Sequence, residues 1–481
     1  MTAPDYSKKW QVLIAISFGV FLATLDSSIV NISLPTLENK LNTDFASVQW
    51  VVLAYLLTIT VLLLGIGRLA DMIGKKSLYI AGFFIFTIGS LLCGLSNKVT
   101  WLIFFRVLQA IGGSFLMALG PALLAEGFPP EERGRALGIN GLAVSLGIIT
   151  GPTLGGIILA NLGWNWIFFV NIPVGLLAIP IGIRSLPRIN KQNDEKFDFR
   201  GGLLLFLTLS CLLFGLTISQ NRGFLSSPSI ILFTAFLLLL LLFVWTEKRI
   251  EQPVVDLSLF HNKLFSVNII TGFLTFVASA GTVFLVPFYL QNVLNYDPET
   301  SGLLMSVFPI ALGITGPISG WLSDKYGFRL LTIIGLFVLT LSYFNLSRLS
   351  IQTTWWEFVL CYIPIGIGMG LFQSPNNSAI LSSASANRLG VVSGLLAISR
   401  TLGQTSGIAI IGAIWTALVF KSSGFLTQGA TSAPAAFQVN GLHIVCLILG
   451  TILSLGTVLS IIAWRQERTA TKSLVIEPQI K

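Results

Sequence analysis

The feature that most constrains the fold of this chain is a series of fourteen apolar windows, each about 20 residues long. A helix of this length spans the roughly 30 Å hydrocarbon core of a bilayer. Only 10% of the residues are charged, against about 25% in soluble proteins. The sequence therefore predicts an all-α integral membrane protein with fourteen transmembrane helices. The windows begin near Gln11, Val48, Leu78, Thr100, Ala136, Trp166, Gly201, Ser229, Val267, Gly302, Leu330, Glu357, Val391 and Gly441.

The basic residues are distributed unevenly between alternate loops. If the N-terminus is cytoplasmic, the cytoplasmic segments hold 22 of the 29 Lys and Arg residues and the external loops hold five. Positive residues accumulate on the cytoplasmic side of membrane proteins, so we expect a multi-pass protein of the cell (inner or plasma) membrane with both termini in the cytoplasm. This asymmetry accounts for the net charge of +9, and no nucleic-acid partner is expected.

An internal repeat divides the chain into two halves. Residues 67–76 and 320–329 both read G-x-L-x-D-x-x-G followed by a basic residue, at an offset of 253 positions. An even number of windows separates the copies, which is typical of two parallel halves related by an axis along the membrane normal. We therefore predict two six-helix bundles with an inserted two-helix hairpin between them.

The domain boundaries follow from this division. They are a first bundle at 1–187, a linker and inserted hairpin at 188–249, an interfacial segment with the second bundle at 250–464, and a cytoplasmic tail at 465–481. The interfacial segment mixes apolar and charged residues, which fits either a short helix on the membrane surface or an ordinary loop.

One carboxylate lies deep within an apolar window. Asp26 falls inside the run 12–37, where an ionised group is costly and usually faces a charged partner, a cavity or a proton path. Arg106 in the fourth window is expected at a similar depth, in the outer half of the bilayer, so the two side chains can pair. Gln109 and Gly113 share a helix face with Arg106. We predict that the Asp26–Arg106 pair loads and releases a proton when the contact between the two side chains changes; a purely architectural ion pair is the alternative.

Several segments resemble motifs of the major facilitator superfamily, and the fourteen windows resemble its drug:proton antiporter branch. These segments are residues 26–35, 67–76, 106–113 and 147–156, and the similarity covers almost the whole chain. The resemblance implies two bundles that alternate access to a central cavity. The last of these segments is similar to the motif associated with antiporters, which bears on the direction of transport.

Small residues in the fifth window predict a conformational gate. Gly147, Gly151 and Gly155 recur every fourth residue and leave one helix face without side chains, so a helix of the other bundle can pack closely there. Pro152 permits a kink, and Gly156 completes the predicted gate. Ordinary packing of small residues is the alternative.

The two copies of the repeated loop suggest a cytoplasmic latch. Asp71 and Asp324 lie at helix C-termini, where the helix dipole disfavours an acid. The resemblance implies that each reaches the facing bundle, pairs with arginines there and latches the outward-open state. A solvated charge cluster that only sets orientation is the alternative. The residues assigned to the latch are Gly67, Asp71, Gly74, Lys75, Arg133, Arg135, Asp324 and Arg388.

Other polar and aromatic residues are candidates for the substrate cavity. Arg400 lies mid-window with no acidic residue in the membrane part of its own half, so it must use carbonyls, water or the substrate. For each aromatic side chain, lipid-facing or core packing is the alternative. The cavity candidates are Asn31, Gln109, Phe284, Phe288, Gln291, Phe372, Asn376 and Arg400.

These features predict a proton-coupled exporter of amphipathic, cationic small molecules. The alternatives are an exporter or flippase of an endogenous lipid, siderophore or metabolite, and a membrane scaffold or sensor that transports nothing. The four cysteines are isolated and no nucleotide-binding, catalytic or metal-site pattern is present in the sequence, so we expect no enzyme, no metal and no cofactor. The expected partners are the bilayer, protons and a small-molecule substrate, and the expected state is a monomer.

Overall fold

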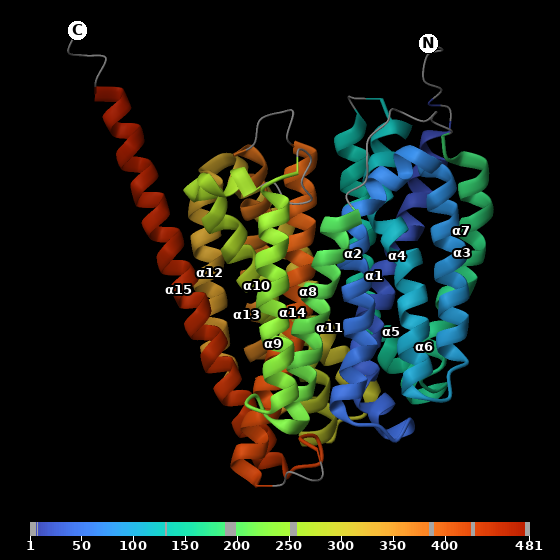
Figure 1. Cartoon of the computed structure of the whole chain (residues 1–481), viewed down its shortest axis with the longest axis vertical. Coiled ribbons are helices and arrows are strands. Elements are labelled where there is room, and N and C mark those ends of the chain that lie inside the picture. Colours follow the sequence, from blue (N-terminus) through green and yellow to red (C-terminus); the bar gives the residue numbers. More distant parts are fainter. Residues whose placement is uncertain are drawn as a thin grey trace.

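The computed structural model describes residues 6, 8–129, 132–187, 199–250, 257–383, 389–424 and 429–476. Fourteen of the helices in this part of the chain are long and apolar enough to cross a membrane, which confirms the predicted fold class. They stand side by side along the long axis of the molecule, with both termini at one end (Figure 1). We call this the basic end, because it carries Lys9, Lys75 and Arg133, and the opposite end the far end.

The first bundle contains seven helical segments, of which α6 and α7 form one span in two pieces. They are α1 (Lys9–Lys40), α2 (Phe45–Ile73), α3 (Lys75–Gly94), α4 (Val99–Gly127), α5 (Arg133–Asn161), α6 (Trp166–Phe169) and α7 (Asn171–Ser185).

The second bundle is built from α10 to α15. Its helices are α10 (Lys263–Phe288), the π-helix η3 (Tyr289–Val293), α11 (Pro298–Tyr326), α12 (Phe328–Leu346), α13 (Trp355–Ser382), α14 (Leu389–Ser423) and α15 (Ala435–Ile476). The last helix continues to Ile476, well into the segment expected as a tail, and projects beyond the bundle (Figure 1). Of the expected interfacial segment, residues 251–256 lie outside the described part, and a short 3₁₀ helix, η2 (Leu257–His261), precedes α10.

Local sequence signals set several helix boundaries. The Asp44 side chain accepts a hydrogen bond from the Ser47 backbone N–H at the start of α2, and Thr354 and Glu357 form a capping box at the start of α13. The repeated motif ends each time in a glycine with a left-handed backbone: Gly74 has φ +105° and Gly327 has φ +84°. Such a residue stops one helix and starts the next within a single position, which explains this part of the motif.

The inserted hairpin of α8 (Phe199–Arg222) and α9 (Ser227–Glu247) lies against both bundles, because α8 contacts α2 and α14. Trp50 Nε1 of α2 donates a hydrogen bond to Thr217 Oγ1 of α8 at 3.0 Å. Only Ser229, Phe243 and Glu247 of α9 are buried, as expected for a helix with most of its surface toward lipid.

The two bundles pack tightly together at the far end. A Cβ atom added at Gly302 of α11 would lie 2.2 Å from the Pro152 carbonyl oxygen of α5, so these helices meet backbone to backbone. Nearby, Phe45 of α2 contacts the rings of Phe284 and Trp415. Three hydrogen bonds also join the bundles at this end: Gln49 Nε2 to Ile408 O (2.6 Å), Gln291 Nε2 to Ile32 O (3.0 Å) and Thr431 Oγ1 to Glu38 Oε1 (2.5 Å).

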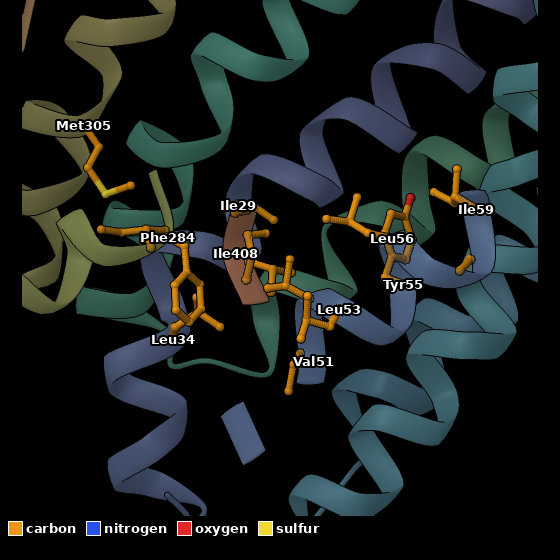
Figure 2. Packing of buried hydrophobic residues seen from close by; sticks show 14 of the residues in the cluster. Ile29, Leu34, Val51, Leu53, Tyr55, Leu56, Ile59, Phe284, Met305 and Ile408 are labelled. Atoms are coloured by element: carbon orange, nitrogen blue, oxygen red, sulfur yellow. The ribbon is translucent and has the colours of Figure 1, made fainter. Parts of the chain in front are cut away.

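The bundles are apart at the basic end. Cβ atoms added at Gly138 and Gly141 of α5, or at Gly316 of α11, would meet no atom of another segment within 4 Å. Figure 2 shows part of the apolar core where the bundles meet, with Ile29 and Leu53 of the first bundle and Ile408 of the second. The structure is therefore closed at the far end and open toward the basic end.

Candidate functional site

A cavity of about 340 Å³ lies between the bundles at mid-height. It is lined by residues of α1, α2, α4, α5, α10, α11, α13 and α14, so both halves of the chain build it. Apolar side chains form much of the wall, and among the described residues that line it there is no acidic side chain. Its polar lining consists of Thr24, Ser27, Ser28, Asn31, Tyr55, Ser145, Ser279, Gln373, Arg400, Thr401 and Gln404.

Asp26 lies behind the cavity wall at the centre of a buried polar network. Its carboxylate accepts hydrogen bonds from Arg106 Nη1 at 2.5 Å, Gln109 Nε2 at 2.7 Å and Asn171 Nδ2 at 2.9 Å. Asp26 is fully buried, and four helices, α1, α3, α4 and α7, contribute to the network. Ser90 of α3 extends it by accepting a hydrogen bond from Gln109 Nε2 at 2.7 Å.

The Arg106 guanidinium is held by the protein on every side. Besides Asp26, it donates to Gln109 Oε1 at 2.7 Å and, through Nε, to the Val51 carbonyl oxygen at 3.1 Å. The side chain is 1% exposed. A buried ion pair is tolerated when hydrogen bonds satisfy its remaining polar atoms, and here the two charges cancel within the first bundle.

Tyr55 separates this network from the cavity. Its side chain lines the cavity, and the Arg106 guanidinium carbon lies 4.0 Å from the centre of its ring, a cation–π contact. The Tyr55 hydroxyl has no hydrogen-bond partner among the described residues. The Tyr55 ring therefore lies between the cavity and the Asp26 network and contacts both.

The predicted cavity candidates divide into four groups. Asn31 and Arg400 line the cavity as expected. Gln109 instead belongs to the buried network around Asp26. Phe372 and Asn376 line a separate space of about 10 Å³ between α10, α13 and α14, where Asn376 Nδ2 donates to the Asn268 carbonyl oxygen at 3.2 Å.

The remaining three candidates were wrong as cavity residues. Phe284 and Phe288 are buried in the aromatic cluster with Phe45 at the far end, and Gln291 joins the bundles there through the Ile32 carbonyl. They lie near the end of α10 or just beyond it, past the depth of the cavity. Their sequence pattern indicated a buried helix face, but not the depth at which the cavity ends.

The predicted gate is partly wrong in its contacts. Added Cβ atoms at Gly147, Gly151 and Gly155 would meet α1, a helix of their own bundle, at 2.1 Å, 2.5 Å and 2.7 Å. The contact with the other bundle is made instead by Pro152 and Gly156, where a Cβ atom on Gly156 would lie 2.4 Å from the Pro298 carbonyl oxygen.

Pro152 also explains a contact inside the first bundle. A proline has no N–H, so the Ile148 carbonyl oxygen of α5 loses its usual partner one turn later. The Ser28 hydroxyl of α1 donates to that oxygen at 3.0 Å. The Ser28 hydroxyl of α1 therefore replaces the hydrogen bond that Pro152 cannot donate within α5.

Among the latch residues whose side chains the structure describes, no pair between the two bundles is formed. Lys75 pairs with Glu126 of its own bundle at 2.5 Å, Arg133 Nε donates to the Phe128 carbonyl, and Arg135 lies over the Trp10 ring. Asp324 is exposed at the basic end. The described residues at this end are apart, which fits a structure that is open there. Arg388 lies outside the described residues, as do the Asp71 side chain and the surroundings of Gly67, so the predicted latch stays a prediction.

Sequence reasoning missed three residues of this site. Asn171 donates a hydrogen bond to Asp26, Ser90 accepts hydrogen bonds from Gln109 and Asn171, and Tyr55 covers Arg106. A buried carboxylate in hydrocarbon needs donors, so polar residues at a matching depth in neighbouring windows were the available signal. The tertiary structure was needed to show which of them face Asp26.

Comparisons with known proteins agree with this architecture. A family model described as Major Facilitator Superfamily matches residues 16–408. The chain is 36% identical to the riboflavin transporter RibZ of Clostridioides difficile, over 93% of this chain and 97% of that protein. It is 30% identical to the multidrug transporter protein MdtP of Bacillus subtilis, over 88% and 77% respectively. Among solved structures, a bacterial homologue of the human lysosomal transporter Spinster superposes with a TM-score of 0.70 at 16% identity, covering 96% of this chain and 98% of the other.

Proposed function

Because the chain belongs to the Major Facilitator Superfamily, we propose that it is a proton-coupled exporter of amphipathic small molecules that works by alternating access. The positive-inside rule places the basic end in the cytoplasm of a cell whose inner or plasma membrane holds the protein. The structure is then open to the cytoplasm. The proton gradient supplies the energy without a cofactor, and a single chain contains all the parts of the mechanism.

The observation that carries this proposal is the position of Tyr55 between the cavity and the Asp26 network. A ligand in the cavity contacts the same ring that stacks on Arg106. A ligand that presses the ring onto Arg106 keeps the Arg106–Asp26 pair intact and Asp26 ionised. When the ligand leaves and the ring moves, Arg106 loses one of its contacts and its hold on Asp26 weakens, so the carboxylate can take up a proton. Ligand and proton thereby compete, because the ring of Tyr55 contacts both the cavity and Arg106.

The far-end contacts supply the mechanical part of the proposal. Export requires the cavity to open at the far end, so the backbone contact between α5 and α11 must separate. The hydrogen bonds from Gln49 to Ile408 and from Gln291 to Ile32 must also break. Such a contact between rigid bundles has two arrangements, closed and open, which is what alternating access needs.

A pair of variants tests the role of Asp26 against an architectural ion pair. Asp26→Asn leaves Arg106 buried without a counter-charge, which we expect to cost about 3 kcal/mol of stability. The double variant Asp26→Asn/Arg106→Gln restores neutrality, so its melting temperature should recover toward the wild-type value. The transport readout is the exchange of an internalised dye or riboflavin in proteoliposomes under an imposed pH gradient.

We expect gradient-driven transport to be lost in both variants, while exchange without a gradient survives in the double variant. Gradient-driven transport at the wild-type rate in the double variant would show that the pair is architectural. If the wild-type protein moved no compound from a broad panel under any gradient, the scaffold or sensor alternative would replace the exporter.

A second candidate function is transport of a neutral, polyhydroxylated ring compound such as a flavin. The observation that favours it is the hydroxyl- and amide-rich cavity lining, which includes Ser27, Asn31, Gln373 and Gln404. A relative that covers nearly the whole chain bears the name of a riboflavin transporter. Counterflow of labelled riboflavin in proteoliposomes tests it, and failure of unlabelled riboflavin to drive uptake excludes it.

A further inference from the structure

We propose that Arg400 makes the cavity an anion-binding site, so that the transported compounds carry a carboxylate, phosphate or similar negative group on an apolar body. This inference rests on the proposed transport function and names the substrate class of the same cavity. It replaces the expectation of cationic substrates drawn from the sequence.

Arg400 is presented to the cavity by a rigid part of α14. Arg400, Thr401 and Gln404 all line the cavity, with Arg400 and Gln404 one turn apart. The next turns of α14 lie directly on α10, because an added Cβ at Gly403 would meet the Phe273 carbonyl oxygen at 2.9 Å and one at Gly407 the Val277 carbonyl oxygen at 2.4 Å. The guanidinium is therefore carried by a fixed backbone, which reduces the entropy cost of binding.

Arg400 has no counter-charge in the part of the chain that the structure describes. No hydrogen bond or ion pair from its guanidinium is formed there, and its contact is with the Phe276 ring, 5.9 Å from the guanidinium carbon. The buried Arg106 of the first bundle, by contrast, donates hydrogen bonds to Asp26, Gln109 and the Val51 carbonyl oxygen. A guanidinium inside a membrane protein with open hydrogen-bonding positions is costly unless an acceptor arrives.

The cavity around Arg400 has a net positive character. The described lining residues include one basic side chain and no acidic one. The buried carboxylate of the first bundle, Asp26, is paired with Arg106, and Tyr55 lies between that pair and the cavity. A cationic compound would meet an uncompensated like charge, whereas an anionic group meets a fork of N–H donors that suits planar oxygen pairs.

The rest of the lining fits an amphipathic anion. Phe276, Phe308 and Met369 supply an apolar surface for a ring system, and Gln373 and Gln404 supply neutral donors and acceptors near its polar edge. An anion exported against one entering proton moves two charges in the same sense across the membrane. Transport of such a compound should therefore respond to the membrane potential as well as to the pH gradient.

The test compares three dyes of similar size on the purified full-length protein in detergent. The probes are fluorescein as the anion, rhodamine 123 as the cation and riboflavin as the neutral compound, with binding measured by fluorescence anisotropy. The variants are Arg400→Gln, Arg400→Lys and the control Arg348→Gln, which removes the same charge from an exposed site at the far end. Melting temperatures establish that each variant is folded.

We expect wild-type protein to bind fluorescein more tightly than rhodamine 123. Arg400→Gln should weaken fluorescein binding roughly tenfold or more, while Arg400→Lys should keep the preference for the anion and Arg348→Gln should change neither. Riboflavin affinity should change by less than about threefold in all three variants.

The proposal is overturned if wild-type protein binds rhodamine 123 more tightly than fluorescein, or if Arg400→Gln binds fluorescein as wild type does. The wild-type comparison needs no variant, so poor folding of Arg400→Gln leaves the proposal open to refutation. These are equilibrium measurements without a proton gradient, so gradient-driven transport at the wild-type rate in the Asp26 double variant would refute the proposed role of Asp26 in antiport and leave the anion site standing.

Discussion

At the scale of single residues, function depends on which buried polar atoms have partners. Asp26 and Arg106 satisfy each other, with help from Gln109 and Asn171, and so form a neutral unit that belongs to the protein. Arg400 is carried into the cavity without such a unit. In the proposed mechanism, a proton on Asp26 would disturb its pair with Arg106, and an anionic ligand would supply the acceptor that Arg400 lacks. Tyr55 is the residue that connects them, because its ring touches Arg106 and the cavity at once.

Substitutions at Tyr55 distinguish its ring from its hydroxyl. The hydroxyl is buried without a hydrogen-bond partner among the described residues, so Tyr55→Phe should leave stability and transport close to wild type. Tyr55→Leu removes the ring over Arg106, a contact worth about 1 to 2 kcal/mol, and opens the Asp26 network to the cavity. We expect proteoliposomes with Tyr55→Leu to leak protons without substrate, as measured with an internal pH-sensitive dye. Equal rates of proton leak in Tyr55→Phe and Tyr55→Leu would show that the Tyr55 ring has no role in proton coupling.

At the scale of elements, α5 has two functions on two faces. One face carries Gly147, Gly151 and Gly155 and packs closely on α1 within the first bundle. On another face, Gly156 allows the backbone of α5 to lie close to α11 of the second bundle. The first contact should persist throughout transport, because it lies within a rigid body. The second has to form and break, because it lies between the bodies that move.

Two alanine variants of α5 test this division. Gly156→Ala places a methyl group against the Pro298 backbone, so it should destabilise the far-closed state by about 1 to 3 kcal/mol and shift the population toward far-end opening. Gly151→Ala places a methyl group against Ser28 of α1, so it should lower the melting temperature in either state. Electron–electron distances between spin labels at the exposed positions Asn161 and Glu299 report the opening. Unchanged distances in Gly156→Ala would contradict the assignment.

At the scale of the whole molecule, the inserted hairpin is connected to the movement of the bundles. Gln220 Nε2 of α8 donates to Gln49 Oε1 at 2.7 Å, and the amide nitrogen of the same Gln49 side chain donates to the Ile408 carbonyl of α14. One side chain therefore joins the first bundle, the second bundle and the hairpin. The hairpin therefore contacts, through Gln220, the side chain that donates a hydrogen bond across the closed far end.

Removing the hairpin's hold on Gln49 should favour far-end opening. Gln220→Leu deletes one buried hydrogen bond, worth about 1 kcal/mol, so we expect roughly a fivefold shift in the ratio of open to closed states. The control is Thr217→Val, also on α8. This variant removes a hydrogen bond from Trp50 of α2 and leaves the bond between Gln220 and Gln49 in place. The same spin-label pair measures both. An equal shift in the two variants would mean that the hairpin acts through general packing and not through Gln49.

The sequence by itself determined the fourteen spans, the two repeated halves and the pairing of Asp26 with Arg106. These follow from local properties: the length of apolar windows matches the bilayer, and a charge in hydrocarbon needs a partner wherever the chain places it. Only the tertiary structure decided which neighbour each helix face meets. Phe284 and Phe288 belong to the far-end closure, the glycine stripe of α5 faces its own bundle, and Asn171 and Tyr55 complete the Asp26 site. Helix rotation and depth are set by packing among all the spans together, so a pattern along one helix cannot specify them.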